Sequence, residues 1–376
     1  MQKVLHLLIT DYKVDSRVRN ETESLLETGY QIDVFCLKSN DTIRKELRRG
    51  INIIRYGFSN NKITKILTAY IQFIYYSLKG DYRLVHAHDF TALPAGFIIS
   101  VIKRIPLIYD THELWSESEH ESYPSCVFKI AYWIEKYFAR KANYVITVSD
   151  SIKDYLRVYF NNPNLETVRN IPSYTHQDSA DLNDKKSGVE GTVPTFIFAG
   201  SIDRKRGLNT ILQSLGLIGD LEYKFLFLVD ELTGNEIVRQ AGRYELKDRV
   251  IIEKVVPQDK LIEHLSHADI GVHAIENSCL NHEYCLPNKI FEYINAGLAI
   301  LCTDVKEMSQ LVHTYDIGMT FRSSDVLDLA EKMRSLLNDK KNIKKYKSNA
   351  QKLSKAHSWE EEYKKLKKIY KGLILN

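Results

Sequence analysis

The sequence places a glutamate one turn inside a short helix whose neighbouring residues are apolar. In the stretch CLPNKIFEYINAGLAILCTD (285–304), the helix is predicted to begin near Asn288, so that Asn288 and Glu292 share one face. The free N–H groups and the positive dipole end of such a helix attract anions. A phosphate at the helix N-terminus, with ribose hydroxyls on Glu292, would suit a nucleotide. The alternative is a solvated glutamate on a partly exposed helix.

A basic turn follows a predicted strand in the stretch FIFAGSIDRKRGLNTIL (196–212). The strand is predicted to end at Gly200, the turn carries Lys205 and Arg206, and Gly207 lets the backbone enter the next helix. Cations at the carboxyl end of a strand, beside a helix N-terminus, are well placed to neutralise a diphosphate. The alternative is a solvated basic turn without a ligand.

Histidines and acids gather at the ends of two further predicted strands. They are His86, His88 and Asp89 in VHAHDF, and His112 and Glu113 in YDTHELWSE. Four of these residues could be metal ligands, but no cysteine accompanies them and alternate side chains of a strand share one face, so no metal is expected. A buried structural role suits His86 at least as well as a ligand role. His112 lies just past its strand and can donate a hydrogen bond to a sugar or to a developing charge.

Short apolar runs alternate with helical patterns along both halves of the chain. Near-continuous Val/Ile/Leu strands separated by helices indicate parallel sheets covered on both faces. We therefore predict two doubly wound α/β units in tandem, joined by a polar linker, with ligands at the carboxyl ends of the strands and in the cleft between the sheets. The linker is 175–193, and the predicted strands are 3–10, 30–37, 51–58, 84–89, 106–113, 143–150, 194–200, 224–230, 250–256, 269–275, 298–304 and 316–321.

Length, composition and motifs narrow the class of protein. The chain has 376 residues, which is too long for one ordinary core, and its net charge of +4 is too mild to argue for nucleic acid. Five dispersed cysteines fit a reducing cytoplasm better than a disulfide framework. The sequence shows no signal peptide and no apolar run of about 18 residues, so a cytoplasmic protein is expected. The first strand-to-helix turn lacks G-x-G-x-x-G, which disfavours a dinucleotide oxidoreductase.

The helix predicted at 61–80 has an apolar pattern that allows two interpretations. Its apolar residues recur at three- and four-residue spacing, and it follows the basic stretch RKELRRG (44–50). Such a helix can lie on the inner surface of the cytoplasmic membrane and receive a lipid-linked acceptor. Alternatively, it packs on the first sheet as an ordinary amphipathic helix.

These motifs together resemble glycosyltransferase family 4, the retaining nucleotide-sugar glycosyltransferases with two facing Rossmann-like domains, the GT-B architecture. The resemblance covers nearly the whole chain in family order, and its most specific pieces are LPNK-F-E-Y--AGL and YD-HEL. It is closest in pattern to the branch that builds bacterial surface polysaccharides. It implies an acceptor domain at 1–174, the linker 175–193, a donor domain at 194–356 and a C-terminal helix at 357–376 that packs back on the first domain.

The resemblance implies a role for each motif residue. Glu292 matches the glutamate that holds the donor ribose, and His112 matches the histidine beside the transferred sugar. Lys205 and Arg206 fall where the family places basic residues on the donor pyrophosphate. Further implied donor contacts are Gly200, Ser201, Glu283, Leu286, Pro287, Asn288 and Lys289, and implied acceptor or cleft residues are Asp15, Arg17, His88, Asp89 and Glu113.

Two positions depart from the family pattern. The family often has a further glutamate eight residues before the one in the helix, whereas Tyr284 stands there in this chain, with Glu283 adjacent. Either Glu283 takes that role or the role is absent. The residue after the strand-end glycine is often arginine and is Ser201 here, which leaves more of the diphosphate charge to Lys205 and Arg206.

The reaction implied by the resemblance is retaining transfer of a sugar from a UDP- or GDP-linked donor. The acceptor is a hydroxyl of a glycan or lipid-linked glycan, in cell-envelope polysaccharide biosynthesis. No metal or other cofactor is expected, because cations and a helix dipole would stabilise the leaving diphosphate. Two alternatives are a nucleotide-sugar epimerase of the same fold and a non-catalytic subunit that binds another transferase.

Overall fold

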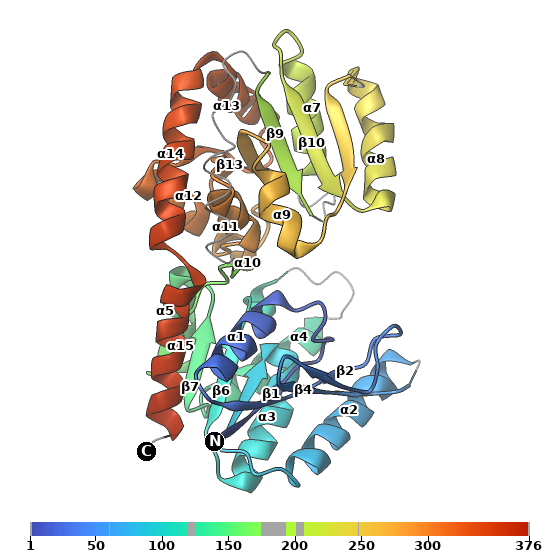
Figure 1. The fold of residues 1–376 in the computed structure, drawn as a ribbon, viewed down its shortest axis with the longest axis vertical. Helices are drawn as coiled ribbons and strands as arrows, with labels where there is room; N and C mark the ends of the chain where they lie inside the picture. The colour runs from blue at the N-terminus through green and yellow to red at the C-terminus, as the bar shows by residue number, and fades with distance from the viewer. Residues whose placement is uncertain are drawn as a thin grey trace. The chain divides into compact units, whose positions relative to one another are not determined.

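The computed structural model divides the chain into two compact units (Figure 1). The first unit is Met1–Pro172 with Trp359–Asn376, and the second unit is Ser173–Ser358. Of the predicted linker, only Val193 belongs to the part of the chain that the structure describes. The described residues are 2–59, 61–118, 125–173, 193–200, 207–246 and 248–374.

The first unit is built on an eight-stranded sheet of order β3-β4-β2-β1-β5-β6-β7-β8. All neighbouring strands are parallel except β3 and β4, as the near-continuous apolar strand sequences predict. The strands are β1 (Lys3–Leu7), β2 (Gln31–Leu37), β3 (Lys45–Arg48), β4 (Ile51–Tyr56), β5 (Leu84–His88), β6 (Leu107–Thr111), β7 (Tyr144–Thr147) and β8 (Leu165–Thr167).

Two edge strands of this sheet were not predicted. The strand β3 has the charged sequence KELR and pairs antiparallel with β4 through Arg49 and Gly50, both of which have positive φ (50° and 94°). This is the backbone geometry of a tight hairpin, which turns the basic stretch 44–50 into part of the sheet. The strand β8 has only three residues and no apolar run that could identify it.

The helices of the first unit follow from the crossovers between parallel strands. The core on one side joins α1 and α15 to the sheet, with Val18 and Leu25 from α1 and Leu366 and Tyr370 from α15. The C-terminal helix therefore returns to the first unit, as the fold class predicts. The helices are α1 (Ser16–Glu27), α2 (Lys62–Ser77), α3 (Asp89–Lys103), α4 (Ser125–Ala139), α5 (Asp150–Phe160) and α15 (Trp359–Ile374), with the 3-10 turn η1 (Trp115–Glu117).

The second unit is a six-stranded, wholly parallel sheet of order β11-β10-β9-β12-β13-β14. Its predicted strands are all confirmed, and the core consists largely of aromatic and aliphatic side chains from β9, β10, α7 and α13. The strands are β9 (Thr195–Ala199), β10 (Lys224–Val229), β11 (Val250–Lys254), β12 (Ile270–His273), β13 (Ala299–Thr303) and β14 (Gly318–Phe321).

Helices connect successive strands of the second sheet. Their arrangement completes a doubly wound α/β unit, so the chain has the two-domain Rossmann-like fold predicted from its sequence. They are α7 (Leu208–Leu217), α8 (Glu231–Ala241), α9 (Gln258–Leu265), α10 (Leu280–Glu283), α11 (Asn288–Asn295), α12 (Lys306–Tyr315), α13 (Val326–Asn338) and α14 (Lys340–Ala356), with the 3-10 turn η3 (Gly242–Tyr244). Among the described residues, none of the helices has both the length and the apolar character that a membrane crossing requires.

Candidate active site

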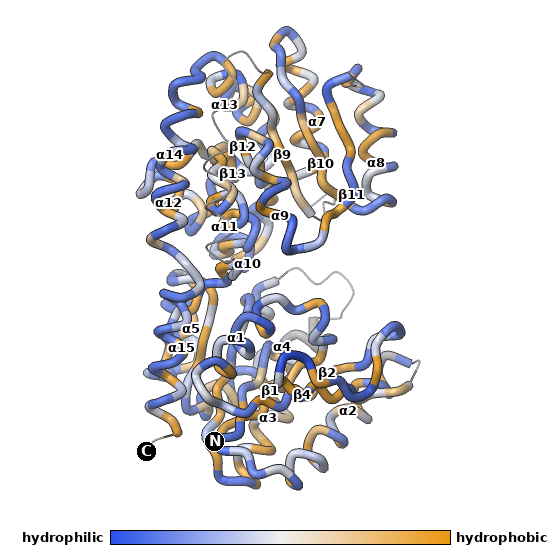
Figure 2. Tube along the Cα trace, viewed as in Figure 1, coloured by the Kyte–Doolittle hydropathy of each residue, from blue (hydrophilic) through white to orange (hydrophobic). Residues whose placement is uncertain are grey.

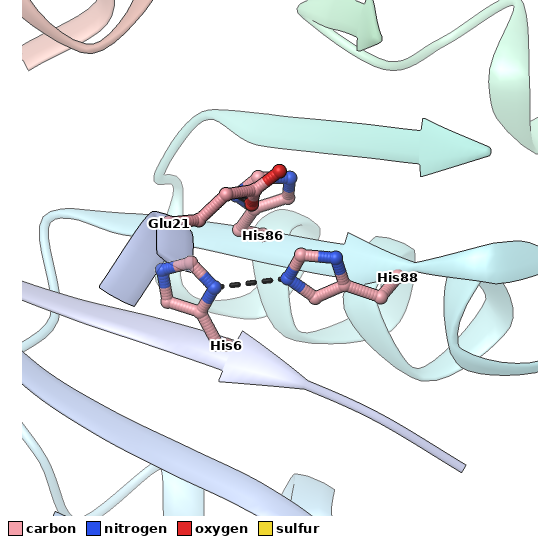
Figure 3. A group of neighbouring side chains, drawn as sticks. All are labelled: His6, Glu21, His86 and His88. Atoms are coloured by element: carbon pink, nitrogen blue, oxygen red, sulfur yellow. Dashed lines mark hydrogen bonds and ion pairs between the residues drawn. The ribbon is translucent and has the colours of Figure 1, made fainter. Parts of the chain in front are cut away.

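Buried polar side chains gather toward the carboxyl end of the first sheet. His6 comes from β1, His86 and His88 come from β5, and Asp110 comes from β6, three strands that pair in that order. Glu21 reaches the same group from α1 (Figure 3). None of the five side chains belongs to a residue that is more than 2% exposed. Strand order, not distance along the chain, brings them together.

Arg17 on α1 holds Asp110 in place. Its Nε and Nη2 donate to the two carboxylate oxygens of Asp110 at 2.8 and 3.0 Å, and its Nη1 donates to the carbonyl of Val168 at 2.8 Å. Asp15 caps α1 by accepting from the backbone N–H of Val18 at 3.0 Å, which fixes the turn from which Arg17 projects. The Arg17 side chain is 1% exposed, so the structure gives it internal partners. A role for it beside a ligand stays a prediction.

Two carboxyl groups in this buried group differ in charge. Burial raises the pKa of both, but at Asp110 the Arg17 guanidinium and His112 outweigh burial and hold the pKa well below its usual range. At Glu21, repulsion by the Asp110 carboxylate adds to burial and raises the pKa well above its usual range, although Arg17 Nε lies 3.2 Å from Glu21 Oε1. These surroundings therefore favour the protonated form of Glu21 and the ionised form of Asp110.

His112 follows β6 directly and lies between two carboxylates. Its Nδ1 is 3.4 Å from Asp89 Oδ2, its Nε2 is 3.6 Å from Asp110 Oδ2, and its backbone N–H donates to Asp89 Oδ1 at 3.1 Å. Burial lowers the pKa of His112, but the charges of Asp89 and Asp110, with a smaller contribution from Asp15, raise it to about 10. The side chain is 19% exposed. The structure thus brings an imidazolium, partly open to solvent, to the edge of the first sheet.

The remaining histidines form a hydrogen-bonded network with the C-terminal helix. His6 Nδ1 and His88 Nε2 are 2.9 Å apart, and the Tyr370 hydroxyl from α15 lies 2.7 Å from His86 Nδ1 and 3.2 Å from His6 Nε2. Burial lowers the pKa of all three histidines, so they are neutral at physiological pH. This arrangement gives His86 the structural role considered from sequence, and it includes His88 in the same network.

Metal binding can be tested against these contacts. Two groups in the described residues have ligand atoms within 4.8 Å of one another: His6, Glu21, His86 and His88, and also His88, Asp110 and His112. The protein provides partners to some of these side chains, since Tyr370 bonds to His6 and His86 and Arg17 holds Asp110 in a bidentate pair, whereas His86 Nε2, His88 Nδ1 and the Glu21 oxygens accept or donate no hydrogen bond among the described residues. We derive no chemical step from a metal here.

In the second unit, the helix α11 places a lysine over the strand-end glycine. Gly200 follows β9 with a φ of +107°, and the Lys289 ammonium occupies the position that a Cβ at residue 200 would take. The Tyr293 hydroxyl accepts from the Ala199 backbone N–H at 3.1 Å and donates to the Val272 carbonyl at 3.2 Å. These bonds tie α11 to the ends of β9 and β12. A cation therefore lies where β9 ends.

Glu292 lies one turn into α11, on a helix that begins after Pro287. Burial raises the pKa of Glu292, and the Lys289 charge opposes this only in part. Its neighbours Ile290, Phe291 and Ile294 are buried, whereas Glu292 itself is half-buried. A carboxylate in this position gains from hydroxyl or N–H donors that a ligand brings.

The residues before α11 lie on and after the short helix α10. The side chain of Asn277 donates to the Glu283 carboxylate, and the Lys306 ammonium lies 5.2 Å from the centre of the Tyr284 ring. Leu286 is buried at 5% exposure and anchors the turn into α11. Glu283 thus has a protein partner, and the family's glutamate position holds an aromatic ring beside a cation.

Several predicted positions add little to this geometry. Ser201, Lys205 and Arg206 lie outside the described residues. Glu113 is exposed, and its carbonyl accepts from Thr111 Oγ1 at 2.7 Å. Sequence analysis missed four residues of the polar group: His6, Glu21, Asp110 and Tyr370.

Two Rossmann-like α/β units in tandem are the architecture of the GT-B glycosyltransferases. A family model described as "Glycosyltransferase Family 4" matches residues 14–172, and one described as "Glycosyl transferases group 1" matches residues 179–353. The chain therefore belongs to glycosyltransferase family 4. It is a glycosyltransferase that uses a nucleotide-sugar donor.

Three known proteins illustrate the similarity. A chitobiosyldiphosphodolichol beta-mannosyltransferase of Kluyveromyces lactis is 22% identical over 98% of this chain and 90% of that protein. A sucrose-phosphate synthase of Thermosynechococcus elongatus has a TM-score of 0.82 at 17% identity, covering all of both chains. The HepE protein of Anabaena, solved with UDP-glucose, has a TM-score of 0.74 at 15% identity, covering 99% of this chain and all of that one. At such identities the solved structures establish the fold.

Proposed function

We propose that this protein transfers a sugar from a UDP- or GDP-linked donor to a hydroxyl of a glycan or lipid-linked glycan, with retention of anomeric configuration. The observation that carries the proposal is the Lys289 ammonium above Gly200 with Glu292 one turn further along α11. A cation and a helix N-terminus suit a diphosphate, and a half-buried carboxylate suits a pair of ribose hydroxyls. In the K. lactis relative, the name itself indicates a lipid-linked acceptor, which supports the same acceptor class here.

Bond cleavage at the anomeric carbon would place negative charge on the leaving diphosphate. Lys289 and the α11 dipole would stabilise that charge, with Lys205 and Arg206 as further cations. The acceptor hydroxyl would attack from the face of the leaving group and give its proton to a phosphate oxygen. His112, held as an imidazolium by Asp89 and Asp110, would donate a hydrogen bond to the transferred sugar. In this scheme no step needs a metal, so EDTA should leave turnover unchanged.

The donor site can be tested by nucleotide binding. We expect calorimetry to show UDP or GDP binding to the wild type, and Lys289→Met to weaken it by about tenfold or more, because a charge-assisted bond to phosphate is lost. The matched control is Lys352→Met, which removes an exposed lysine of α14 in the same unit. Equal affinities in all three proteins would contradict the proposed donor site.

The reaction itself can be tested with a screen of nucleotide sugars. Donors that raise the thermal midpoint would be incubated with the enzyme, first alone and then with glycan and lipid-linked acceptors, and products identified by NMR. We expect nucleotide release, and a product linkage with the anomeric configuration of the donor. An inverted linkage would refute retention, and an isomerised sugar formed from the donor alone would identify an epimerase.

A role in cell-envelope polysaccharide biosynthesis follows from the proposed acceptor. The structural neighbours include WaaG, described as a glycosyltransferase involved in lipopolysaccharide biosynthesis, with a TM-score of 0.66 at 11% identity over 95% of this chain and 96% of that one. A lipid-linked acceptor is presented at a membrane surface, so we also propose peripheral contact with the membrane. Deletion of the gene should therefore change the sugar composition of a surface glycan.

A further inference from the structure

Three helices of the first unit expose apolar side chains to solvent. The helix α2 packs against α3, and α3 packs against α4 (Figure 1). Along the tube, α2 and α3 carry apolar stretches (Figure 2). We name the exposed side of these helices the α2–α4 surface. Its large apolar side chains are Ile63, Leu67, Ile71, Tyr75 and Leu78 along α2 and its C-cap, Ile98, Val101 and Ile102 on α3, and Ile130, Trp133, Ile134 and Tyr137 on α4.

The pattern on α2 shows that these residues form a stripe on the side away from the sheet. Ile63, Leu67 and Ile71 recur every four residues and are 71%, 59% and 68% exposed. Ala69 and Phe73, which lie on the other side of the helix, are fully buried. The helix is therefore apolar on both sides, and the sheet covers only one of them. A helix that only packs on a sheet has a polar outer side.

The same pattern recurs on α4, with aromatic residues added. Ile130, Trp133 and Tyr137 share one side of this helix and are 60%, 67% and 54% exposed, whereas Ala131 and Glu135 face inward. Exposed tryptophan and tyrosine are favoured at the boundary between lipid and water, because their rings are apolar with one polar atom. The apolar area therefore extends across neighbouring helices and is more than scattered single residues.

Charges around the α2–α4 surface are basic. Among the described side chains of these helices, the carboxylates are Asp89 at the start of α3 and Glu135, which is buried and bonded to Tyr109. Among the described side chains, the cations of the three helices and of the residues just after each C-terminus are Lys65, Lys79, Lys103, Arg104, Lys129, Lys136, Arg140 and Lys141.

Two of these lysines lie over aromatic rings of the same surface. The Lys79 ammonium is 4.3 Å from the centre of the Tyr75 ring, and the Lys141 ammonium is 4.9 Å from that of Tyr137. Long basic side chains at the rim of an apolar area can keep their charge at the level of lipid headgroups while their stems cover apolar surface. The apolar centre and the basic rim of the α2–α4 surface together match an anionic bilayer, which offers acyl chains and negative headgroups.

We infer that the α2–α4 surface rests on an anionic lipid bilayer, with the three helices lying along the membrane plane. This deepens the proposed function, because a lipid-linked acceptor would then be presented to the first unit at the bilayer to which that unit is bound. The charge of the surface favours a bilayer over a second copy of the chain, since two copies would bring basic rims together.

Vesicle flotation of the full-length protein tests this inference. We expect wild type to float with vesicles of phosphatidylcholine and phosphatidylglycerol, and to do so far less with phosphatidylcholine alone. The triple variant Leu67→Gln, Ile71→Gln, Trp133→Gln should bind anionic vesicles about tenfold or more weakly, because membrane affinity scales with the apolar area inserted. The matched control replaces three exposed apolar residues of the second unit, Leu232, Val238 and Leu327, by glutamine and should bind as wild type.

A second variant separates charge from apolar area. Lys129→Gln, Arg140→Gln, Lys141→Gln should lose about tenfold or more in affinity for anionic vesicles, because each cation near such a surface contributes about 1 kcal/mol. Its weak binding to neutral vesicles should stay unchanged. The corresponding control removes Lys341, Lys352 and Lys355 of α14.

The outcomes distinguish this inference from the proposed function. Wild type that stays in the soluble fraction with both kinds of vesicle would overturn membrane binding, as would equal binding by the apolar variant and its control. If the wild type forms a dimer and binds no vesicles, and the apolar variant is a monomer, the α2–α4 surface would be assigned to contact with a second copy of the chain instead. Nucleotide binding should be unchanged in all of these variants, so a failure of the donor site would appear separately in calorimetry.

Discussion

Replacing the two buried carboxyl groups of the first unit one at a time should give opposite results, because their surroundings favour the protonated form of Glu21 and the ionised form of Asp110. Asp110→Asn removes the negative charge that lies 2.8 Å from Arg17, and neither side chain is more than 1% exposed. Removing one partner of a buried ion pair typically costs about 3–5 kcal/mol. Ionisation of Glu21 beside Arg17 would recover part of this. We therefore expect Asp110→Asn to lower the free energy of unfolding by about 2–4 kcal/mol.

Glu21→Gln should leave the free energy of unfolding unchanged or raise it at pH 7. In the unfolded chain a glutamate ionises with a pKa of about 4.3, whereas in the folded protein burial and Asp110 raise the Glu21 pKa well above that. Folding therefore favours uptake of a proton by Glu21, and between the unfolded and the folded pKa the stability falls by up to about 1.4 kcal/mol per pH unit as pH rises. Glutamine avoids this cost.

The stability of the two variants relative to wild type should change with pH in opposite directions. The advantage of Glu21→Gln over wild type should be absent below pH about 4 and grow toward neutrality. The folded pKa of Asp110 is depressed, so its carboxylate contributes stability above the unfolded pKa of about 3.9, and that contribution is lost as pH falls. The gap between Asp110→Asn and wild type should therefore narrow in acid.

Urea unfolding, monitored by tryptophan fluorescence, measures these differences in the free energy of unfolding of the first unit. The chain has three tryptophans, Trp115, Trp133 and Trp359, and all belong to the first unit. The control Glu27→Gln, at an exposed position of the same helix, should change the free energy of unfolding by less than about 0.5 kcal/mol.

The double variant Glu21→Gln, Asp110→Asn gives the sharpest result. It leaves Arg17 without either neighbouring carboxylate, so its cost should exceed the sum of the single costs by about 1–3 kcal/mol. Two outcomes would refute the assignment of charge: equal losses in the two single variants, or a double variant whose cost is additive.

Three further changes test other parts of the site. His112→Gln should lower sugar transfer by about tenfold or more. Because the charges of Asp89 and Asp110 raise the pKa of His112 to about 10, the variant should also lower the thermal midpoint of unfolding at neutral pH. In initial-rate assays the wild-type contribution of His112 should be lost only as pH rises through that value. Nucleotide affinity of the wild type should rise with pH through the raised pKa of Glu292, because ribose hydroxyls favour the carboxylate, and calorimetry of Glu292→Gln should show no such rise. Tyr370→Phe leaves His6 and His86 without their shared hydroxyl partner and should cost about 1–3 kcal/mol in urea unfolding.

The fold was predictable because apolar strands in a parallel sheet are distinct from amphipathic helices along the chain. The predicted strands of both units are present, and the return of α15 to the first unit was implied by the family resemblance. The strand β3 was missed because an edge strand needs no apolar face, and its basic residues indicated a membrane surface instead. The strand β8 is too short to give a pattern.

The positions of the candidate site residues could be predicted only where a motif lies at or near the end of a single element. His112 after β6 and Glu292 within α11 are of this kind. Glu21 and Tyr370 are not, because they reach the site from helices at opposite ends of the first unit's sequence, and no local spacing relates them to β5 or β6. Asp110 stood in the motif YDTHE, but its importance depends on Arg17, which lies 93 residues away in sequence.

The charges of the buried polar side chains in the first unit together stabilise one positive charge at the edge of the sheet. His112 is its partly exposed cation, with a side chain 19% exposed, and it keeps its proton only while Asp110 and Asp89 are ionised beside it. Burial alone would protonate Asp110, and the bidentate bond from Arg17 prevents this. In the proposed reaction, Arg17 would therefore act as a positioning residue, because it holds Asp110 and Asp110 in turn faces His112. The same charge distribution acts on Glu21, where burial and the nearby Asp110 carboxylate raise the pKa and favour the protonated form.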